Sequence, residues 1–538
     1  MKTSPRFSSS ALAVLLCALV VGMGGAPARA QYSADNQTNT VTAFTGWTGD
    51  YFVGSNTSFD VLLISGNGRL TNANGYVGYQ ALSSNNLVVV AGSNAAWSNS
   101  GTLYVGGTGN RLIITNGGRV FDNEGRVGGH AGVGGNVVVV SGNGSFWTNG
   151  AGGLKIGASL NSENRLIITN GGRVAVGNTL VLAWNAGTSN NLVLVSDSNS
   201  VLRTGANNAI NVGGYGWGNQ MVISNGAIAS SGYGRVGGGL GGTGGSNASV
   251  IITGAGSVWS NGATAAVGFD VANLGRVSVL NGGSLVVAGV FQVDSSSLLM
   301  VSNGGQLSLG VVTNQGTIRV INSKVTFNSP VVLGGAYLSD PSTNTFGSNL
   351  TVTASGALSG SNGDLFVFHQ DFINQSTNQG QFNLAHAAVL FTNATTHLLS
   401  VSNSGSADLG QGYTSFDQVA TNFAIGQLSI ASGNRVTLAG NQDSLTNALY
   451  VGWLDIQGIS TNSFDAVTNG LFAALDLPNV NLYYDTYNPQ NEWLNAWIPS
   501  TGYDLWGGGL LLPIPEPTSL LAVVGGAVLL TWLRRRKG

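Results

Sequence analysis

The sequence predicts an all-β protein, a right-handed parallel β-helix (solenoid) of about ten or more coils. Composition is the first reason: Gly accounts for 83 of 538 residues and charged residues for only 8%, against about 25% in typical globular domains, so long solvated helices are excluded. A hydrophobic share of 43% excludes disorder. The second reason is a tandem repeat of short β-branched runs separated by Asn, Gly and Ser, without any helix-length period. One unit cannot bury its apolar side alone, so the units must stack.

The N-terminus has the pattern of a secretory signal. Two basic residues precede an apolar stretch over residues 11–23, and Ala28-Arg29-Ala30 forms a small-x-small cleavage site. We expect residues 1–30 to be removed before Gln31 and the chain to be exported across the inner membrane. Residues 31–44 would form a lead-in or cap.

The repeat has two related halves of about 25–29 residues. One block reads "LIITNGG" or a close variant, and it starts at Leu62, Leu112, Leu166, Met221 and Val277. The other reads "VVVxGxxSxW" and supplies Trp97, Trp147 and Trp259. If each half is one coil, equivalent Val and Ile residues lie about 4.8 Å apart and form an inner column. We assign residues 45–324 to this repeat.

The corners between strands support the solenoid. Asn-Gly-Gly provides the positive φ that sharp bends need, and stacked Asn side chains can hydrogen-bond as a ladder. A β-sandwich or a propeller is the alternative, because a blade of about 40–50 residues nearly fits the double unit. The shared pattern of the two halves favours the solenoid.

After residue 324 the period fades. Residues 325–512 are predicted to form an irregular β-rich region that ends the repeat, with one short helix near Phe464–Leu475. Residues 513–538 then combine Pro515-Glu516-Pro517, an apolar segment and a basic tail, namely Arg534, Arg535, Arg536 and Lys537. The sequence predicts a single transmembrane helix over residues 518–533, with the basic tail on the cytoplasmic side. An ordinary single-span anchor also fits this tail.

The order Pro-Glu-Pro, apolar span and arginine cluster resembles the PEP-CTERM sorting signal of Gram-negative bacteria. The "LIITNGG" and "VVVxGxxSxW" blocks likewise resemble the β-helical repeat associated with autotransporters and PEP-CTERM proteins. The resemblance implies an inner-membrane precursor that an exosortase-type transpeptidase recognises through Pro515, Glu516, Pro517 and the arginines. It further implies transfer to the cell surface or extracellular matrix, in association with exopolysaccharide.

Charge and cysteine content exclude several activities. Residues 31–512 hold 13 basic and 21 acidic residues, a net −8, so we expect no nucleic-acid binding. The single cysteine, Cys17, lies in the signal, so disulfides and thiolate chemistry are not expected.

Candidate catalytic groups are scattered. His130, His369, His386 and His397 show no metal-ligand spacing, and Gly232–Gly237 matches a dinucleotide motif without the helix that such a motif requires. Asp122 and Glu124 are the nearest acidic pair, in a segment that reads as a solvated turn. We therefore expect no enzyme, cofactor or metal, although a β-helical polysaccharide lyase or hydrolase stays an alternative.

Trp97, Trp147 and Trp259 share one repeat position, which Leu202 fills in another coil. Facing outward, the rings would form a row that stacks on sugars; facing inward, they would fill the core, and Leu202 favours packing. The expected function is that of a secreted structural or adhesive surface protein. A glycan-binding module that uses these tryptophans is the alternative.

Overall fold

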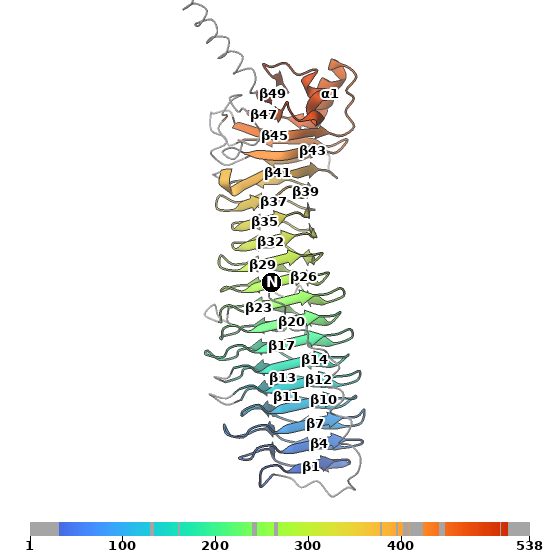
Figure 1. The fold of residues 1–538 in the computed structure, drawn as a ribbon, viewed down its shortest axis with the longest axis vertical. Coiled ribbons are helices and arrows are strands. Elements are labelled where there is room, and N and C mark those ends of the chain that lie inside the picture. Colours follow the sequence, from blue (N-terminus) through green and yellow to red (C-terminus); the bar gives the residue numbers. More distant parts are fainter. Residues whose placement is uncertain are drawn as a thin grey trace, which may run out of the picture.

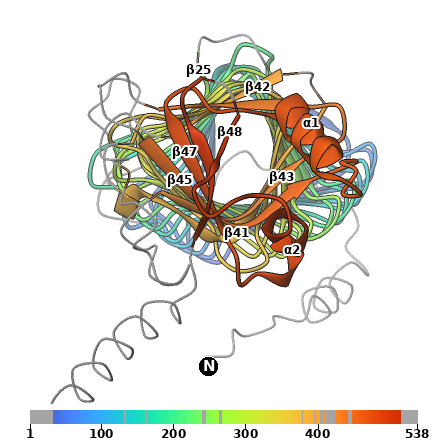
Figure 2. The same ribbon diagram turned by 90° about the horizontal axis from the view of Figure 1, so that it is seen from above.

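The strands wind around one long axis and stack as coils along it (Figure 1). The computed structural model describes residues 32–129, 134–159, 162–238, 245–262, 267–376, 379–393, 396–401, 408, 423–440, 447–505 and 507–514. Within them the chain forms an all-β parallel solenoid of about 16 turns. Viewed along the axis, the coils superimpose around one interior (Figure 2). The β-solenoid prediction is confirmed.

Most coils have three walls. First-wall strands are β1 (Thr38–Val41), β4 (Val61–Ser65), β7 (Leu87–Ala91), β10 (Arg111–Thr115), β12 (Val137–Ser141), β14 (Arg165–Thr169), β17 (Leu192–Ser196), β20 (Gln220–Ser224), β23 (Ser249–Thr253), β26 (Arg276–Leu280), β29 (Leu298–Ser302), β32 (Thr317–Ile321), β35 (Ala336–Asp340) and β38 (Ala357–Ser359). Second-wall strands are β2 (Phe44–Gly46), β5 (Arg69–Asn72), β8 (Ala96–Asn99), β15 (Arg173–Val176), β18 (Val201–Thr204), β21 (Ile228–Ser231), β24 (Val258–Asn261), β27 (Ser284–Val287), β30 (Gln306–Leu309), β33 (Lys324–Phe327), β36 (Thr343–Phe346) and β39 (Leu365–Phe368).

Third-wall strands are β3 (Tyr51–Val53), β6 (Gly75–Val77), β9 (Thr102–Val105), β16 (Leu180–Leu182), β19 (Ala209–Val212), β22 (Tyr233–Val236), β25 (Val267–Val271), β28 (Val290–Val293), β31 (Val312–Asn314), β34 (Val331–Leu333), β37 (Leu350–Val352), β40 (Phe372–Asn374), β42 (Thr396–Ser400), β44 (Arg435–Ala439) and β46 (Leu475–Asp476). Strands β11 (Arg119–Val127) and β13 (Phe146–Ile156) run through the second and third walls. Strands β41 (Phe382–Phe391), β43 (Ala424–Ile430) and β45 (Asn447–Ile456) run through the first and second.

Parallel pairing in register produces the inner column. Ile64, Val90, Ile114 and Val140 are successive partners on β4, β7, β10 and β12, and each is fully buried. Side chains alternate between the two faces of a strand. Because each residue pairs with the residue at the same position of the next coil, a side chain that points inward in one coil is followed by inward side chains in all of them.

Asparagine serves the fold in two places. At the corners, Asn116 and Asn170 have φ of 53° and 52°, as the Asn-Gly-Gly motif predicts. A separate run of buried side chains stands at the entrance to the first wall: Asp60, Asn86, Asn110, Asn136, Asn164, Asn191 and Asn219. The amide Oδ1 of each Asn in this run accepts a hydrogen bond from the backbone N–H one coil earlier, at 2.8–3.3 Å. The predicted Asn ladder exists and runs through these residues. At the corners, Asn94 Nδ2 also donates to Asn67 Oδ1 at 3.0 Å.

The solenoid does not end at residue 324, so the expectation of an irregular region over 325–512 needs correction. The spacing between paired first-wall strands shortens, from 26 residues between Val61 and Leu87 to 19 between Thr317 and Ala336. Phe327, Phe346, Phe368 and Phe391 then occupy one interior column, stacked 5.2–5.4 Å apart. The sequence period faded because corner motifs were lost and aromatic packing replaced them, while the coil itself persists.

The C-terminal end carries the helical elements. α1 (Phe464–Ala474) begins after an N-cap at Ser463 and confirms the predicted short helix. The remaining elements of the described residues are η1 (Gln379–Gln381), which precedes β41, and, further on, η4 (Pro489–Asn491), α2 (Glu492–Asn495), β47 (Val480–Asp485), β48 (Tyr503–Asp504) and β49 (Leu510–Ile514). Strands β47 and β49 extend the parallel stack, and β48 pairs antiparallel to β49.

Candidate functional site

The three repeat tryptophans face inward. Trp97, Trp147 and Trp259 are each 0% exposed, so the candidate glycan contact through these rings is wrong and the packing alternative is correct. Their column alternates large and small residues: Trp147 lies between Val120 and Val174 on neighbouring coils. The smaller valines on the neighbouring coils leave room in the interior for the large indole.

Each buried indole has a matched partner set on the preceding coil. The indole N–H donates a hydrogen bond to a polar side chain on that coil. The third residue after this acceptor is a glycine, and the indole ring lies against it. The acceptors are Asn72 for Trp97 (2.6 Å), Asp122 for Trp147 (2.6 Å) and Ser231 for Trp259 (3.1 Å). The glycines are Gly75, Gly125 and Gly234, where an added Cβ would stand 2.7, 2.7 and 3.1 Å from the corresponding ring. The tryptophans are thus structural anchors.

Asp122 is an ionisable group inside the solenoid. It lies within the continuous strand β11, so the expected solvated turn is wrong. Its carboxylate accepts hydrogen bonds from Trp147 Nε1 and from Asn149 Nδ2, both at 2.6 Å. Burial raises the pKa of Asp122 to about 7, against the lowering effect of those two hydrogen bonds.

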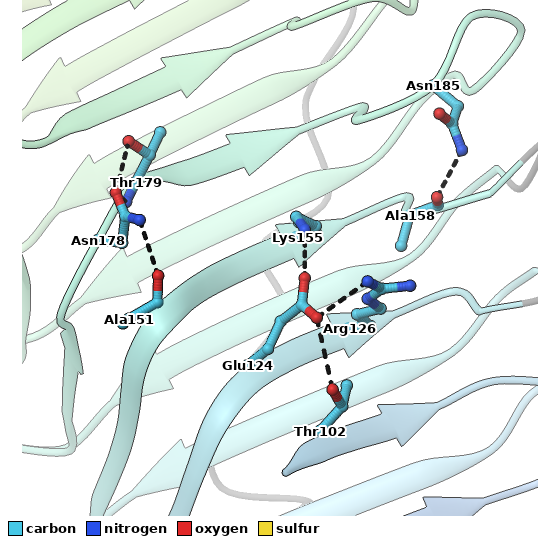
Figure 3. A network of polar contacts seen from close by, with 9 residues as sticks. All are labelled: Thr102, Glu124, Arg126, Ala151, Lys155, Ala158, Asn178, Thr179 and Asn185. Atoms are coloured by element: carbon cyan, nitrogen blue, oxygen red, sulfur yellow. Dashed lines mark hydrogen bonds and ion pairs between the residues drawn. The ribbon is translucent and has the colours of Figure 1, made fainter.

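Glu124, two residues later, faces outward (Figure 3). A register shift between Asp122 and Glu124 turns the strand from the second wall to the third and separates the two carboxylates. Glu124 pairs with Arg126 (2.9 Å) and with Lys155, and it accepts a hydrogen bond from Thr102 (3.4 Å). Burial raises the pKa of Glu124, but the hydrogen bonds and charges of Arg126 and Lys155 outweigh it, and the net pKa is lowered.

Arg126 and Lys155 of this ion cluster also belong to a longer outward-facing row on the third wall. We call it the outer row; it is formed by Phe52, Tyr76, Tyr104, Arg126 and Lys155. Its rings stack at 4.7 and 4.8 Å. The Arg126 guanidinium lies 5.5 Å from the centre of the Tyr104 ring. Since the stacked rings cover one another, the outer row offers ring edges and not faces to a ligand.

A groove lies on the second wall near the C-terminal end, and we call it the Trp453 groove. Its volume is about 590 Å³. Ala388, Gln427 and Trp453 are paired across adjacent coils, and Ser429 and Asp455 stand next to them. The small Ala388 and Gly426 leave room beside the half-buried indole. An indole ring surrounded by amide, hydroxyl and carboxylate groups suits a polar ligand with one apolar side.

The carboxylates of the Trp453 groove do not form a close pair. Asp364 and Asp455 stand three coils apart, about 14 Å along the stack at the usual strand spacing. Asp455 is in register with Val367, so the two residues are also offset along the strand. Paired glycosidase carboxylates lie roughly 5–9.5 Å apart. Asp364 is also occupied, since it accepts hydrogen bonds from the backbone N–H of Ser342 and of Ser361, both at 2.6 Å.

The histidines are dispersed. His386 lines the Trp453 groove, whereas His397 is buried between the Gln370 carbonyl and Asn434, both at 3.1 Å. His369 follows β39, and His130 lies outside the described residues. Within the described ranges, no three His, Cys, Asp or Glu side chains gather so as to hold a metal ion.

The sorting residues Pro515, Glu516, Pro517, Arg534, Arg535 and Arg536 lie outside the described residues, as do the predicted signal peptide and the span over 518–533. In the part of the chain that the structure describes, no helix is long and apolar enough to cross a membrane.

Among known proteins, similarity was found to solved structures alone. No protein-family model and no curated protein matches the chain. Among solved structures, the chain is similar to the TibC-catalysed, hyper-glycosylated fragment of TibA, at 16% identity and a TM-score of 0.27. That match covers 62% of this chain and 96% of the fragment. At this level of similarity we infer nothing about function from it.

Sequence reasoning missed both the partner sets of the tryptophans and the Trp453 groove. A signal for the first existed: Asn72-x-x-Gly75, Asp122-x-x-Gly125 and Ser231-x-x-Gly234 each precede a tryptophan by about one coil. The groove residues come from coils without a shared motif, so only the pairing of β41, β43 and β45 brings them together.

Proposed function

We propose that this protein is an exported structural or adhesive rod, a right-handed parallel β-helix displayed at the cell surface or in the extracellular matrix. The observation that carries the proposal is the single interior column of in-register side chains through about 16 coils, which makes a long and rigid body. The predicted secretory signal supports export. We further propose that the precursor is held in the inner membrane by its C-terminal helix, processed by an exosortase-type transpeptidase and associated with exopolysaccharide.

Enzymatic activity is not part of this proposal. The separation of Asp364 from Asp455 and the internal position of Asp122 argue against a lyase or hydrolase that works with paired carboxylates. Incubation of the purified protein with polysaccharides should release neither reducing ends nor unsaturated products.

Processing of the tail tests the sorting proposal. Wild type should appear at the cell surface about 20 residues shorter, by intact mass, than a Glu516→Ala variant, which should stay full-length in the inner membrane. The proline-flanked stretch is expected to be extended and unpaired, the form that a protease cleft accepts. A wild-type protein that keeps its tail would favour the plain anchor.

A second candidate function is glycan binding, and the Trp453 groove is the observation that favours it. Its half-buried indole lies beside Gln427 and Asp455, so it offers stacking and hydrogen bonding together. Trp453→Ala should reduce capture on the host's exopolysaccharide. Trp217→Ala, which removes a 54% exposed indole far along the chain, should not. Equal capture of the two variants on the exopolysaccharide would contradict glycan binding in the Trp453 groove.

A further inference from the structure

The outer surface of the first wall is unusually apolar. First-wall strands such as "VLLIS", "LVVVA", "VVVVS" and "LVLVS" are hydrophobic at consecutive positions, whereas second-wall strands such as "RLTN" and "VWSN" alternate. Every second residue of the first-wall strands points outward. Over eight consecutive coils, β4 to β23, the central outward position carries Leu63, Val89, Ile113, Val139, Ile167, Leu194, Val222 and Ile251.

These eight side chains form a continuous strip, which we call the apolar face. Val139 is 7% exposed, and the other seven are half-buried. Parallel sheets with near-continuous hydrophobic strands are normally covered on both sides, and large exposed apolar strips mark interaction sites. The fold does not require apolar residues at outward positions. On the second wall of the same coils, outward positions are held by Ser98, Ser230 and Ser260.

We propose that the apolar face is a self-association surface, on which two copies of this chain pack wall to wall with their rods parallel. Eight coils at about 4.8 Å and strands of five residues give a wall of roughly 38 by 16 Å, with the apolar face as its central row. That is on the order of 600 Å² per copy and 1,200 Å² in total, which reaches the range of specific interfaces.

The repeat of the face favours a second copy as its occupant. Side chains stand in rows about 4.8 Å apart along the rod, and a partner must present rows at the same spacing to interdigitate over eight coils. The same wall of a second copy has this row spacing, because it is built from the same coils. The contact is isologous, so it closes at a dimer.

Charges at the two edges decide the orientation. The edge where first-wall strands start carries Arg111 and Arg165, both exposed, and the edge where they end carries hydroxyls and Asp197. A two-fold axis parallel to the rod places the arginine edge of one copy over the Asp197 edge of the other. An axis perpendicular to the rod would place arginine over arginine, which like-charge repulsion disfavours.

Sedimentation equilibrium of the full-length protein at tens of micromolar tests the proposal. Wild type and Ser230→Lys should be dimers, and Ile167→Lys should be a monomer with the same far-UV circular dichroism. The lysine at 167 points outward, so it leaves the core intact. Because the tail is present in all three proteins, it cannot explain a difference between them. A monomeric wild type, including one that binds lipid vesicles or another protein, would overturn the proposal, as would an Ile167→Lys dimer.

Cross-linking tests the orientation. In a Cys17→Ser background the chain has no cysteine, so single cysteines can be placed on the apolar face. With parallel rods, Val89→Cys and Val222→Cys should each form homodimers with a short bismaleimide, since each position faces itself. Ser98→Cys on the second wall should not. Cross-linking only in a mixture of the Val89→Cys and Val222→Cys proteins would show antiparallel rods and contradict the parallel arrangement.

Discussion

Ionisation of Asp122 should destabilise the solenoid. An unfolded Asp has a pKa near 3.9, whereas burial raises the pKa of Asp122 to about 7 in the folded chain. The folded state therefore holds its proton more tightly. The favourable contribution of protonated Asp122 is fully present below about pH 4 and is lost as the pH rises to about 7.

The magnitude follows from the difference between the two pKa values. About three units at roughly 1.36 kcal/mol each correspond to about 4 kcal/mol, and relaxation around a buried charge brings the expected loss to about 2–4 kcal/mol. Asp122→Asn removes the charge and keeps the shape. Asn72 shows that an amide works at this position, because its Oδ1 accepts from Trp97 and its Nδ2 donates to Asn99 at 2.7 Å.

Urea denaturation of wild type and Asp122→Asn at pH 4 and pH 8 measures this effect. The difference in free energy of unfolding between the two proteins should change by about 2–4 kcal/mol over that interval, with the variant the more stable at pH 8. Other titrating groups contribute equally to both proteins and cancel. Identical pH dependence would refute the raised pKa of Asp122 and the dry environment assigned to it.

Three further outcomes are expected. Trp147→Ala should lower the free energy of unfolding by about 3–5 kcal/mol. Gly125→Val should also destabilise the protein, because the added Cβ would stand 2.7 Å from the Trp147 ring. Urea titrations of both variants, with Ser230→Ala as control, measure these effects. The lowered pKa of Glu124 predicts a stabilising contribution at neutral pH that is lost as the pH falls through that pKa, and Glu124→Gln should abolish this acid-side loss in thermal melts. Chelators should leave the thermal midpoint unchanged, whereas a shift would reveal a metal that contributes to folding.

The local features of this protein could be predicted from its sequence because they depend on neighbouring residues. Alternation along a strand has a period of two, and the positive φ at Asn116 or Asn170 is a property of one corner. Repetition of these signals every coil predicts stacking. The corner motifs disappear after residue 324, and for this reason the sequence did not predict that the solenoid continues. The interior column from Phe327 to Phe391 shows that it does.

Two features were decided by the tertiary structure alone. One is the side of the wall that a residue faces where the strand bends, and the other is which residues of different coils contact one another. Asp122 and Glu124 should share a face by simple alternation, but the register shift between them places one inside and the other outside. The indole of Trp147 reaches the interior because Gly125, one coil away, has no side chain. Residues from separate coils meet at the Trp453 groove for the same reason: contact between coils depends on register across the stack, which the order of residues along one coil does not contain.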